Sequence, residues 1–220
     1  MAAPNRAVLQ KFFKRRLGAI LIAHVIMGLA ITLLRFSLFG NDPFSCMQLG
    51  YSNVSGLSYG TCVLIFNAIV IGPIYILDKS YVQLGTVVNM LLTGPIVDIW
   101  YWCLSFFTVF TEPTMFARIV LLIVGVTSSC FGVSLYMMTH LGMGPYDAIG
   151  WIIAARSKGK FQFRSARVMI DACAVAIGFI CGSIVNIGTL IMASCTGPLV
   201  SFFNEYVSVP LIYKGRKFNT

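Results

Sequence analysis

Residues Leu84 to Asp98 read LGTVVNMLLTGPIVD, and residues Ile187 to Ser201 read IGTLIMASCTGPLVS. The two stretches share a Gly-Thr pair near the start and a Thr-Gly-Pro-x-Val run near the end, 103 positions apart. Both are apolar and contain a Gly-Pro pair, which disfavours a regular helix because proline lacks the backbone donor. Paired interruptions in the two halves of a membrane protein are typical of transport sites. We therefore expect two broken helices, each kinked or split into two half-helices, with hinges or half-helix junctions at Gly94, Pro95, Gly197 and Pro198.

The composition excludes an ordinary soluble domain. The 220 residues are 58% apolar and only 10% charged, with a mean hydropathy of +0.85, whereas soluble domains carry roughly a quarter charged residues. The net charge of +9 comes mostly from clusters at residues 6–16, 79, 156–167 and 214–217. Such clusters beside apolar spans mark cytoplasmic loops and argue against a nucleic-acid partner. The seven cysteines form no CxxC pair, so we expect no metal or cofactor.

The apolar runs predict an all-α polytopic protein with six transmembrane helices, at residues 17–39, 60–77, 82–110, 115–138, 167–184 and 186–213. We divide the chain into a basic cytoplasmic segment, two three-span repeats and a basic cytoplasmic tail, at residues 1–16, 17–110, 116–213 and 214–220. Residues 40–59 are interpreted as an external loop. Residues 146–155 are apolar but too short to cross a core of about 30 Å, so they predict a re-entrant or interfacial helix.

The repeat extends to the loops. The motif GNDPF, which begins at Gly40, recurs 102 positions later as GMGPY, which begins at Gly142. Three spans per repeat is an odd number, so the two repeats enter the membrane in opposite directions. The charges agree, because the first loop holds no basic residue and five basic residues follow the second motif. We expect an inverted repeat with both termini in the cytoplasm.

The combination of GNDPFS, GLSYG, LGT with GP, LGMGPYD, RVMID and IGT with GP resembles the YczE/YitT family of bacterial integral membrane proteins. The resemblance covers residues 24–205 and is closer to the YczE branch, because the soluble C-terminal domain usual in YitT-type members is missing. It implies a multi-pass protein of the bacterial cytoplasmic (inner) membrane. Export or transport is suggested for some relatives. The family has no agreed catalytic residues that carry over to this chain.

Polar residues at membrane depth are the candidates for a solute pathway, because ionisable groups there are costly and normally face a cavity or a partner. These candidates are Arg35, Asn67, Asn89, Asp98 and Asp171. Asp98 is alternatively a helix-start cap. Asp171 follows Arg167 by four residues and is alternatively half of a structural ion pair. Arg35 either binds an anion or snorkels to the interface.

The loop motifs supply a second set of candidates, namely Gly40, Asp42, Pro43, Gly142, Gly144, Pro145 and Asp147. Together the features predict a secondary transporter or exporter of a small solute, with a central site between the repeats. Its expected partners are the lipid bilayer, the solute, a coupling ion such as a proton or sodium, and a second copy in a homo-oligomer.

Two other functions compete with transport. The first is a non-transporting membrane regulator or scaffold for a partner protein. The second is an intramembrane enzyme, because Gly56 to Gly60 match the G-x-S-x-G pattern of a nucleophilic serine. That pattern works on a strand-to-helix turn with a histidine nearby, whereas here it opens a membrane helix on the side opposite to His24 and His140. We therefore expect no enzyme activity and no catalytic residue.

Overall fold

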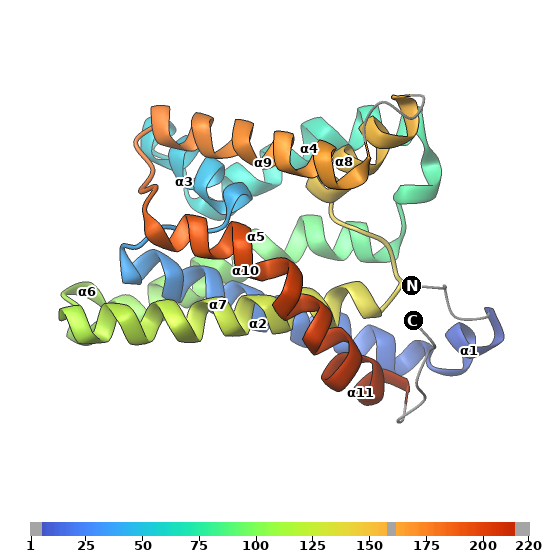
Figure 1. Ribbon diagram of the computed structural model, residues 1–220, viewed down its shortest axis with the longest axis horizontal. Helices are drawn as coiled ribbons and strands as arrows, with labels where there is room; N and C mark the ends of the chain where they lie inside the picture. Colours follow the sequence, from blue (N-terminus) through green and yellow to red (C-terminus); the bar gives the residue numbers. More distant parts are fainter. Residues whose placement is uncertain (1–5, 158–161, 214–220) are drawn as a thin grey trace.

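The computed structural model describes residues 6–157 and 162–213, and all regular structure in this part of the chain is helical (Figure 1). The expected tail at 214–220, the first five residues and part of the basic loop, 158–161, lie outside the described residues. In chain order the elements are α1 (Arg6–Lys11), α2 (Phe13–Ser37), α3 (Pro43–Ser55), α4 (Tyr59–Leu77), the 3-10 turn η1 (Lys79–Tyr81), α5 (Leu84–Ser105), α6 (Thr108–Thr111), α7 (Met115–Met138), α8 (Pro145–Arg156), α9 (Phe163–Ile180), α10 (Ile187–Phe203), the π-helical turn η2 (Asn204–Ser208) and α11 (Val209–Tyr213).

Within the described residues, five segments are long and apolar enough to cross a membrane: α2, α4, α5, α7 and the run from α10 to α11. Bulky apolar side chains such as Ile69, Phe116 and Ile180 remain exposed on the long helices. Soluble proteins rarely expose apolar surface on this scale. The chain is therefore a multi-pass, all-α membrane protein.

A sixth span is not confirmed. The helix concerned, α9, has 18 residues but carries Arg164, Arg167 and Asp171. It is not among the five segments with the length and composition of a span. Charged side chains are costly in lipid and need partners or water, so α9 depends on polar neighbours within the protein.

The expected division into half-helices at Gly94, Pro95, Gly197 and Pro198 is wrong, because α5 and α10 each run without interruption through the Gly-Pro pair. A kink or hinge at these residues stays a prediction. One proline removes a single backbone hydrogen bond, and the bonds on both sides hold the helix together. A Cβ atom on Gly94 would lie 2.7 Å from the Gly60 backbone of α4. Gly94 is therefore required for the close approach of two helices.

The interpretation of residues 40–59 as a loop is also wrong, because they contain α3. The Asp42 carboxylate caps this helix by accepting a hydrogen bond from the Ser45 N–H at 3.1 Å, and Pro43 occupies the first turn, where its missing donor is harmless. The helix expected at residues 146–155 is present as α8. With 13 and 12 residues, α3 and α8 are each about 20 Å long, shorter than a bilayer core of about 30 Å.

The helices form two layers (Figure 1). The first layer contains α3, α4, α8 and α9, with α3 packed on α9 and α4 on α8. The second layer contains α2, α5, α7 and α10, with α2 packed on both α5 and α7, and α7 packed on α10. The main contact between the layers is that of α4 with α5. Each layer therefore combines helices from both halves of the chain.

Two backbone hydrogen bonds connect the halves. The Gly85 N–H donates to the Leu141 carbonyl at 2.7 Å, and the Gly188 N–H donates to the Phe39 carbonyl at 2.8 Å. A Cβ atom on Gly85 or Gly188 would approach the same oxygen to 2.8 or 2.6 Å. The Gly-Thr pairs of the two repeated stretches therefore share a packing requirement, namely a bare backbone at the start of α5 and of α10.

Candidate functional site

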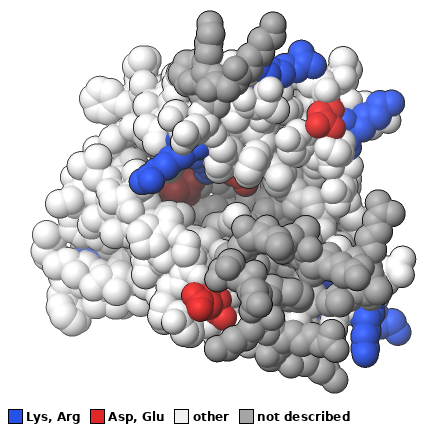
Figure 2. Space-filling model, turned by 45° about the vertical axis from the view of Figure 1, so that its right-hand side comes forward, with Lys and Arg blue, Asp and Glu red and all other residues white. Residues whose placement is uncertain are grey.

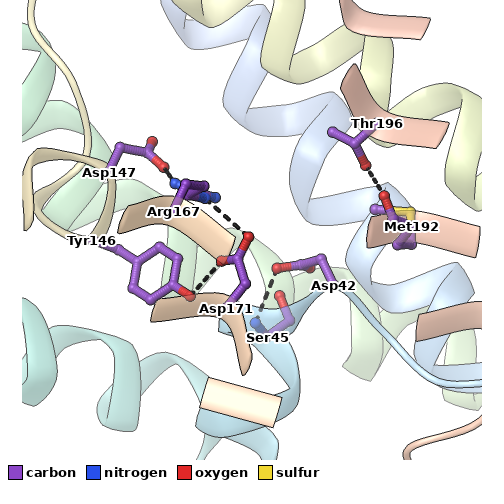
Figure 3. Close-up of polar contacts among 8 residues, drawn as sticks. All are labelled: Asp42, Ser45, Tyr146, Asp147, Arg167, Asp171, Met192 and Thr196. Atoms are coloured by element: carbon purple, nitrogen blue, oxygen red, sulfur yellow. Dashed lines mark hydrogen bonds and ion pairs between the residues drawn. The ribbon is translucent and has the colours of Figure 1, made fainter. Parts of the chain in front are cut away.

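Five polar side chains meet where α3 and α8 begin (Figure 3). They are Asp42, Tyr146, Asp147, Arg167 and Asp171, and we call them the central polar cluster. Asp42 precedes α3, Tyr146 and Asp147 lie in the first turn of α8, and Arg167 and Asp171 lie one turn apart on α9. Asp171 is the ninth of the 18 residues of α9, so the cluster lies about halfway along that helix.

Arg167 pairs with two of the three carboxylates. Its Nε donates to Asp171 Oδ2 at 3.1 Å, and its Nη1 donates to Asp147 Oδ1. The Tyr146 hydroxyl donates to the other Asp171 oxygen at 2.7 Å. The guanidinium carbon of Arg167 lies 4.9 Å from the centre of the Tyr146 ring. The Arg167–Asp171 ion pair considered above is thus confirmed, and it is part of a larger network.

Negative charge exceeds positive charge within the cluster. Among the described residues, no hydrogen bond or ion pair joins Asp42 to Arg167, and the Asp42 carboxylate accepts its hydrogen bond from Ser45. Removal from water raises the pKa of the Asp42 carboxyl group, and the hydrogen bonds from Ser45 oppose the rise. Asp42 therefore holds a proton more readily than a free aspartate does.

The cluster is partly accessible. The side chains of Arg167, Asp147 and Asp171 are 33%, 42% and 24% exposed. Charged groups part-way along a membrane helix face water or protein, because exposure to lipid is costly. Figure 2 shows acidic side chains recessed in a depression on one face of the molecule, beside basic side chains. The cluster is therefore a charged site that water can reach.

The N-termini of the two short helices meet at the cluster. Phe44 and Tyr146 occupy the same position in the two loop motifs, and their ring centroids are 4.9 Å apart. Each is the second residue of its helix. Helix N-termini carry partial positive charge, which here is offset by Asp42 and Asp147.

The remaining loop-motif residues shape the backbone. Gly40 and Gly142 have φ angles of +99° and +122°, which residues with side chains rarely adopt. Pro145 begins α8, as Pro43 begins α3. A Cβ atom on Gly144 would lie 3.1 Å from a side-chain oxygen of α5. The motif therefore positions the polar side chains of the cluster.

Asn67 and Asn89 lie outside the hydrogen-bonded network. Asn67 is halfway along α4 and 2% exposed, and among the described residues no hydrogen bond joins it to the cluster. Asn89 Nδ2 donates to His24 Nε2 at 3.2 Å, while His24 Nδ1 donates to the Ile20 carbonyl at 2.7 Å. The His24 ring lies edge-on to Tyr136, with centroids 5.3 Å apart, so Asn89 belongs to a second polar group.

Asp98 caps a neighbouring helix. Its carboxylate accepts hydrogen bonds from the Ser58 hydroxyl at 2.7 Å and from the Gly60 N–H at 3.0 Å. The expected cap therefore exists, but on α4 and not on the helix that contains Asp98. Ser58 is the N-cap residue of α4 and accepts from the Thr61 N–H at 3.2 Å. The serine of the G-x-S-x-G pattern thus serves the start of a helix.

Arg35 lies at a separate small cavity of about 90 Å³, whose polar lining includes Asn41, Asn53 and Ser183. Its guanidinium carbon lies 3.8 Å from the centre of the Tyr101 ring. Asn41 is 3% exposed, and its side-chain oxygen has no hydrogen-bond partner within the described part of the chain. No hydrogen bond or ion pair among the described residues joins Arg35 to the central polar cluster.

Sequence reasoning missed Tyr146 and assigned Asp147 and Asp171 to different sets. The available signal was the repeat itself, because Tyr146 matches Phe44 and differs from it by a hydroxyl. A polar atom added at a repeated aromatic position indicates a nearby hydrogen-bond partner.

Residues 14–205 match the family described as "Family of unknown function (DUF6198)". The chain belongs to this family. An uncharacterised protein of Haemophilus influenzae is 25% identical over 195 residues, which cover 88% of this chain and 85% of the relative. In Bacillus subtilis, the uncharacterised membrane protein YczE is 24% identical over 84% of this chain and 81% of its own length. The uncharacterised protein YyaS is 24% identical over 89% and 96%, respectively. No solved structure matches the chain.

The resemblance to the YczE group is confirmed. The membrane description of YczE agrees with the five apolar helices. The region matched by DUF6198 includes both short helices and the whole central polar cluster. The cluster is therefore part of the family region of this DUF6198 protein.

Proposed function

We propose that this DUF6198 protein is a secondary transporter of a small solute, with the central polar cluster as the binding site between two inverted repeats. The observation that carries the proposal is an ionised, partly exposed network halfway along α9, where two helices too short to span begin. Transporters built from inverted repeats bind solutes and coupling ions near the midplane, at the ends of discontinuous helices. Here α3 and α8 take the part of the discontinuous helices.

Several features support the inverted repeat. The order of one long helix, one short helix and two long helices occurs from α2 to α5 and again from α7 to α10. The Gly85–Leu141 and Gly188–Phe39 hydrogen bonds join equivalent positions of the two repeats. The packing of α3 on α9 has its counterpart in that of α4 on α8. In this architecture α9 is the sixth span, and its charges face the cluster.

The distribution of basic residues supports an orientation with both termini in the cytoplasm. Lys79 and Arg156 are then cytoplasmic, while Asn53 and Glu112 are external. The resemblance to bacterial membrane proteins supports a location in the cytoplasmic membrane.

The site chemistry favours a solute or ion with positive character. Three carboxylates face one guanidinium, so a cationic group can compete with Arg167 for Asp147 or Asp171. The readily protonated Asp42 is a candidate for exchanging a proton during the cycle. The sequence contains no Walker motif, so we assign the driving energy to an ion or solute gradient.

The test begins with purified protein and a thermal-shift screen of metabolites and antibiotics. Solutes that raise the melting temperature are then offered to proteoliposomes under proton and sodium gradients. We expect gradient-dependent uptake that Asp171→Asn abolishes or uncouples. Asp78→Asn, in the exposed turn after α4, is the matched control and should transport normally. A protein that copurifies in fixed ratio, with no flux for any solute, favours the regulator or scaffold instead.

An enzymatic function has less support. Ser58 hydrogen-bonds Asp98 and Thr61, and His24 hydrogen-bonds Ile20 and Asn89. A serine nucleophile needs a histidine within hydrogen-bond reach as its base. We therefore propose a transporter without enzymatic activity.

A further inference from the structure

We infer that the two layers rock against each other, with the α4–α5 contact as one gate and the facing parts of α9 and α10 as the other. The structure has the first gate closed and the second open. This inference rests on the proposed transport function, and it names the moving parts and the residues that hold them.

The closed gate is a backbone-to-backbone contact held by a carboxylate. A Cβ atom on Gly94 would lie 2.7 Å from Gly60, and one on Gly60 would lie 2.7 Å from Gly94. Asp98, one turn beyond Gly94, accepts hydrogen bonds from the Ser58 hydroxyl and the Gly60 N–H at 2.7 and 3.0 Å. Thr93 beside the contact is only 5% exposed. The start of α4 is thus fastened to the middle of α5.

The equivalent position on α10 lacks such a contact. Gly197 matches Gly94 at the 103-residue offset, but no atom lies within 4 Å of a Cβ built on it. Ser201 takes the place of Asp98 and is exposed. Figure 1 shows α9 and α10 diverging from the segment that connects them, and within the described residues they do not pack extensively. Phe163, at the start of α9, instead stacks on Trp151 of α8, with ring centroids 4.2 Å apart.

Because the two gates occupy equivalent positions of the repeat, one closes when the other opens. A movement that brings the start of α9 onto Gly197 recreates the α4–α5 contact in the other half of the molecule. The same rocking of the first layer separates α4 from Gly94, because that layer is held together by α3 with α9 and α4 with α8. Inverted-repeat transporters achieve alternating access by such rigid-body rocking about a fixed site.

Asp98 explains which state the structure adopts. Its charged hydrogen bonds close the α4–α5 gate, and the serine at position 201 offers a weaker, neutral group to the other gate. The open side is the end at which α9 begins, close to Arg167 on the same helix. The partial exposure of Arg167 and Asp171 agrees with an opening there. In the proposed topology this opening faces the cytoplasm.

The experiment measures cysteine labelling and needs no known solute. In a background lacking the seven native cysteines, Thr93→Cys and Thr196→Cys report on equivalent positions of the two gates. We expect an impermeant maleimide to modify Thr196→Cys from the cytoplasmic face of inside-out vesicles, while Thr93→Cys in intact cells stays protected. Adding Asp98→Ala should speed labelling of Thr93→Cys roughly tenfold, because hydrogen bonds to a charged group are lost. It should slow labelling of Thr196→Cys in proportion to the fraction of molecules that leave the parent state.

Ser58→Ala is the milder second variant, and monodisperse elution in detergent checks that each protein is folded. Reciprocal changes at the two reporters support rocking. Labelling of Thr93→Cys at the rate of a freely exposed cysteine, with no slowing at Thr196→Cys, shows local loosening and overturns the inference, as does an unreactive Thr196→Cys in the parent. Flux without reciprocity leaves transport standing and removes the rocking mechanism. Reciprocity without flux removes the proposed function and leaves the conformational change.

Discussion

The N–H of Gly85 donates a hydrogen bond to the carbonyl of Leu141 at 2.7 Å, which ties the start of α5 to the loop before α8. The two residues belong to different halves of the chain. Because the donor is a main-chain group, the contact depends on the absence of a side chain at position 85, and not on a particular side chain.

Gly85→Ala should therefore destabilise the protein by about 1–3 kcal/mol, the usual cost of overpacking. Its Cβ atom would lie 2.8 Å from the Leu141 oxygen. Gly18→Ala in α2 is the control, because no atom lies within 4 Å of a Cβ built there, and alanine is the better helix former by up to about 1 kcal/mol. Thermal unfolding in detergent measures both. Equal melting temperatures for the two variants would contradict the assigned contact.

The two Gly-Pro pairs should respond differently to the same change. Gly94→Ala places a Cβ atom 2.7 Å from the Gly60 backbone and should cost about 1–3 kcal/mol. Gly197→Ala meets open space and should be neutral or stabilising by up to about 1 kcal/mol. Melting temperatures in one detergent give the comparison. A loss at position 197 as large as that at 94 would mean that α9 already packs there.

Two buried tyrosines allow the stability contributed by a hydrogen bond to be measured apart from that contributed by packing. Tyr146→Phe removes a donor to Asp171 and should lower stability by about 1 kcal/mol, since the carboxylate keeps Arg167 and partial access to water. Tyr136→Phe is the control, because its buried hydroxyl has no hydrogen-bond partner among the described residues. That variant should be neutral or slightly more stable. Denaturation of both variants in detergent measures the two changes in stability. A loss of stability in Tyr136→Phe alone would contradict the hydrogen-bonded network.

Asp42 should make stability depend on pH. Its pKa is raised above the ordinary value of 3.8, so the folded state binds the proton more tightly and stability falls as pH rises through the raised pKa. Asn also caps helices well, so Asp42→Asn should melt higher than the parent at pH 7, with the difference shrinking as pH falls.

Asp78→Asn should show the opposite sign. Hydrogen bonds from Ser80 lower the pKa of Asp78 below 3.8, so its charge adds stability that is present above the ordinary value and lost as pH falls through the lowered pKa. The Asp78→Asn variant should melt slightly lower than the parent at pH 7. Differential scanning fluorimetry from pH 4 to 8 covers both variants, and parallel curves for parent and Asp42→Asn would refute the assignment for Asp42.

The orientation of the protein in the membrane can be tested with the same cysteine labelling as the gates. Single cysteines at Asn53 and Glu112 should react with impermeant thiol reagents from outside intact cells, because both belong to segments free of basic residues. A cysteine at Lys79, in the turn between α4 and α5, should react only in inside-out vesicles. External labelling at position 79 would rule out the proposed inverted topology.

The sequence was sufficient for the membrane class, the family, the long helices and the Arg167–Asp171 pair, because each depends on composition or on local spacing. It was not sufficient for α3. That segment carries Gln48, Ser52 and Asn53 in a helix that is not strongly apolar, so its composition suggested a loop. The cap at Asp42 followed by Pro43 was the overlooked signal for a helix start.

The candidate site was only partly predictable, because it depends on contacts between distant segments. Asp147 reaches Arg167 across the connection between α8 and α9, and Tyr146 reaches Asp171 across 25 positions. Periodicity within one helix contains no information about such pairs. The prediction of half-helices at the Gly-Pro pairs was wrong for a related reason, because Gly94 is required by its close contact with Gly60 on another helix.

The hydrogen bond between Phe39 and Gly188 has a consequence for how the protein is made. The Phe39 carbonyl leaves the ribosome 149 residues before its donor. At 5–20 residues per second, that interval is on the order of ten seconds. Within this interval α7 and α9, on which α2 and α3 pack in the finished protein, are still being synthesised, and α10, which bonds Phe39, follows them. Folding of the nascent first half is therefore completed only after synthesis of the second.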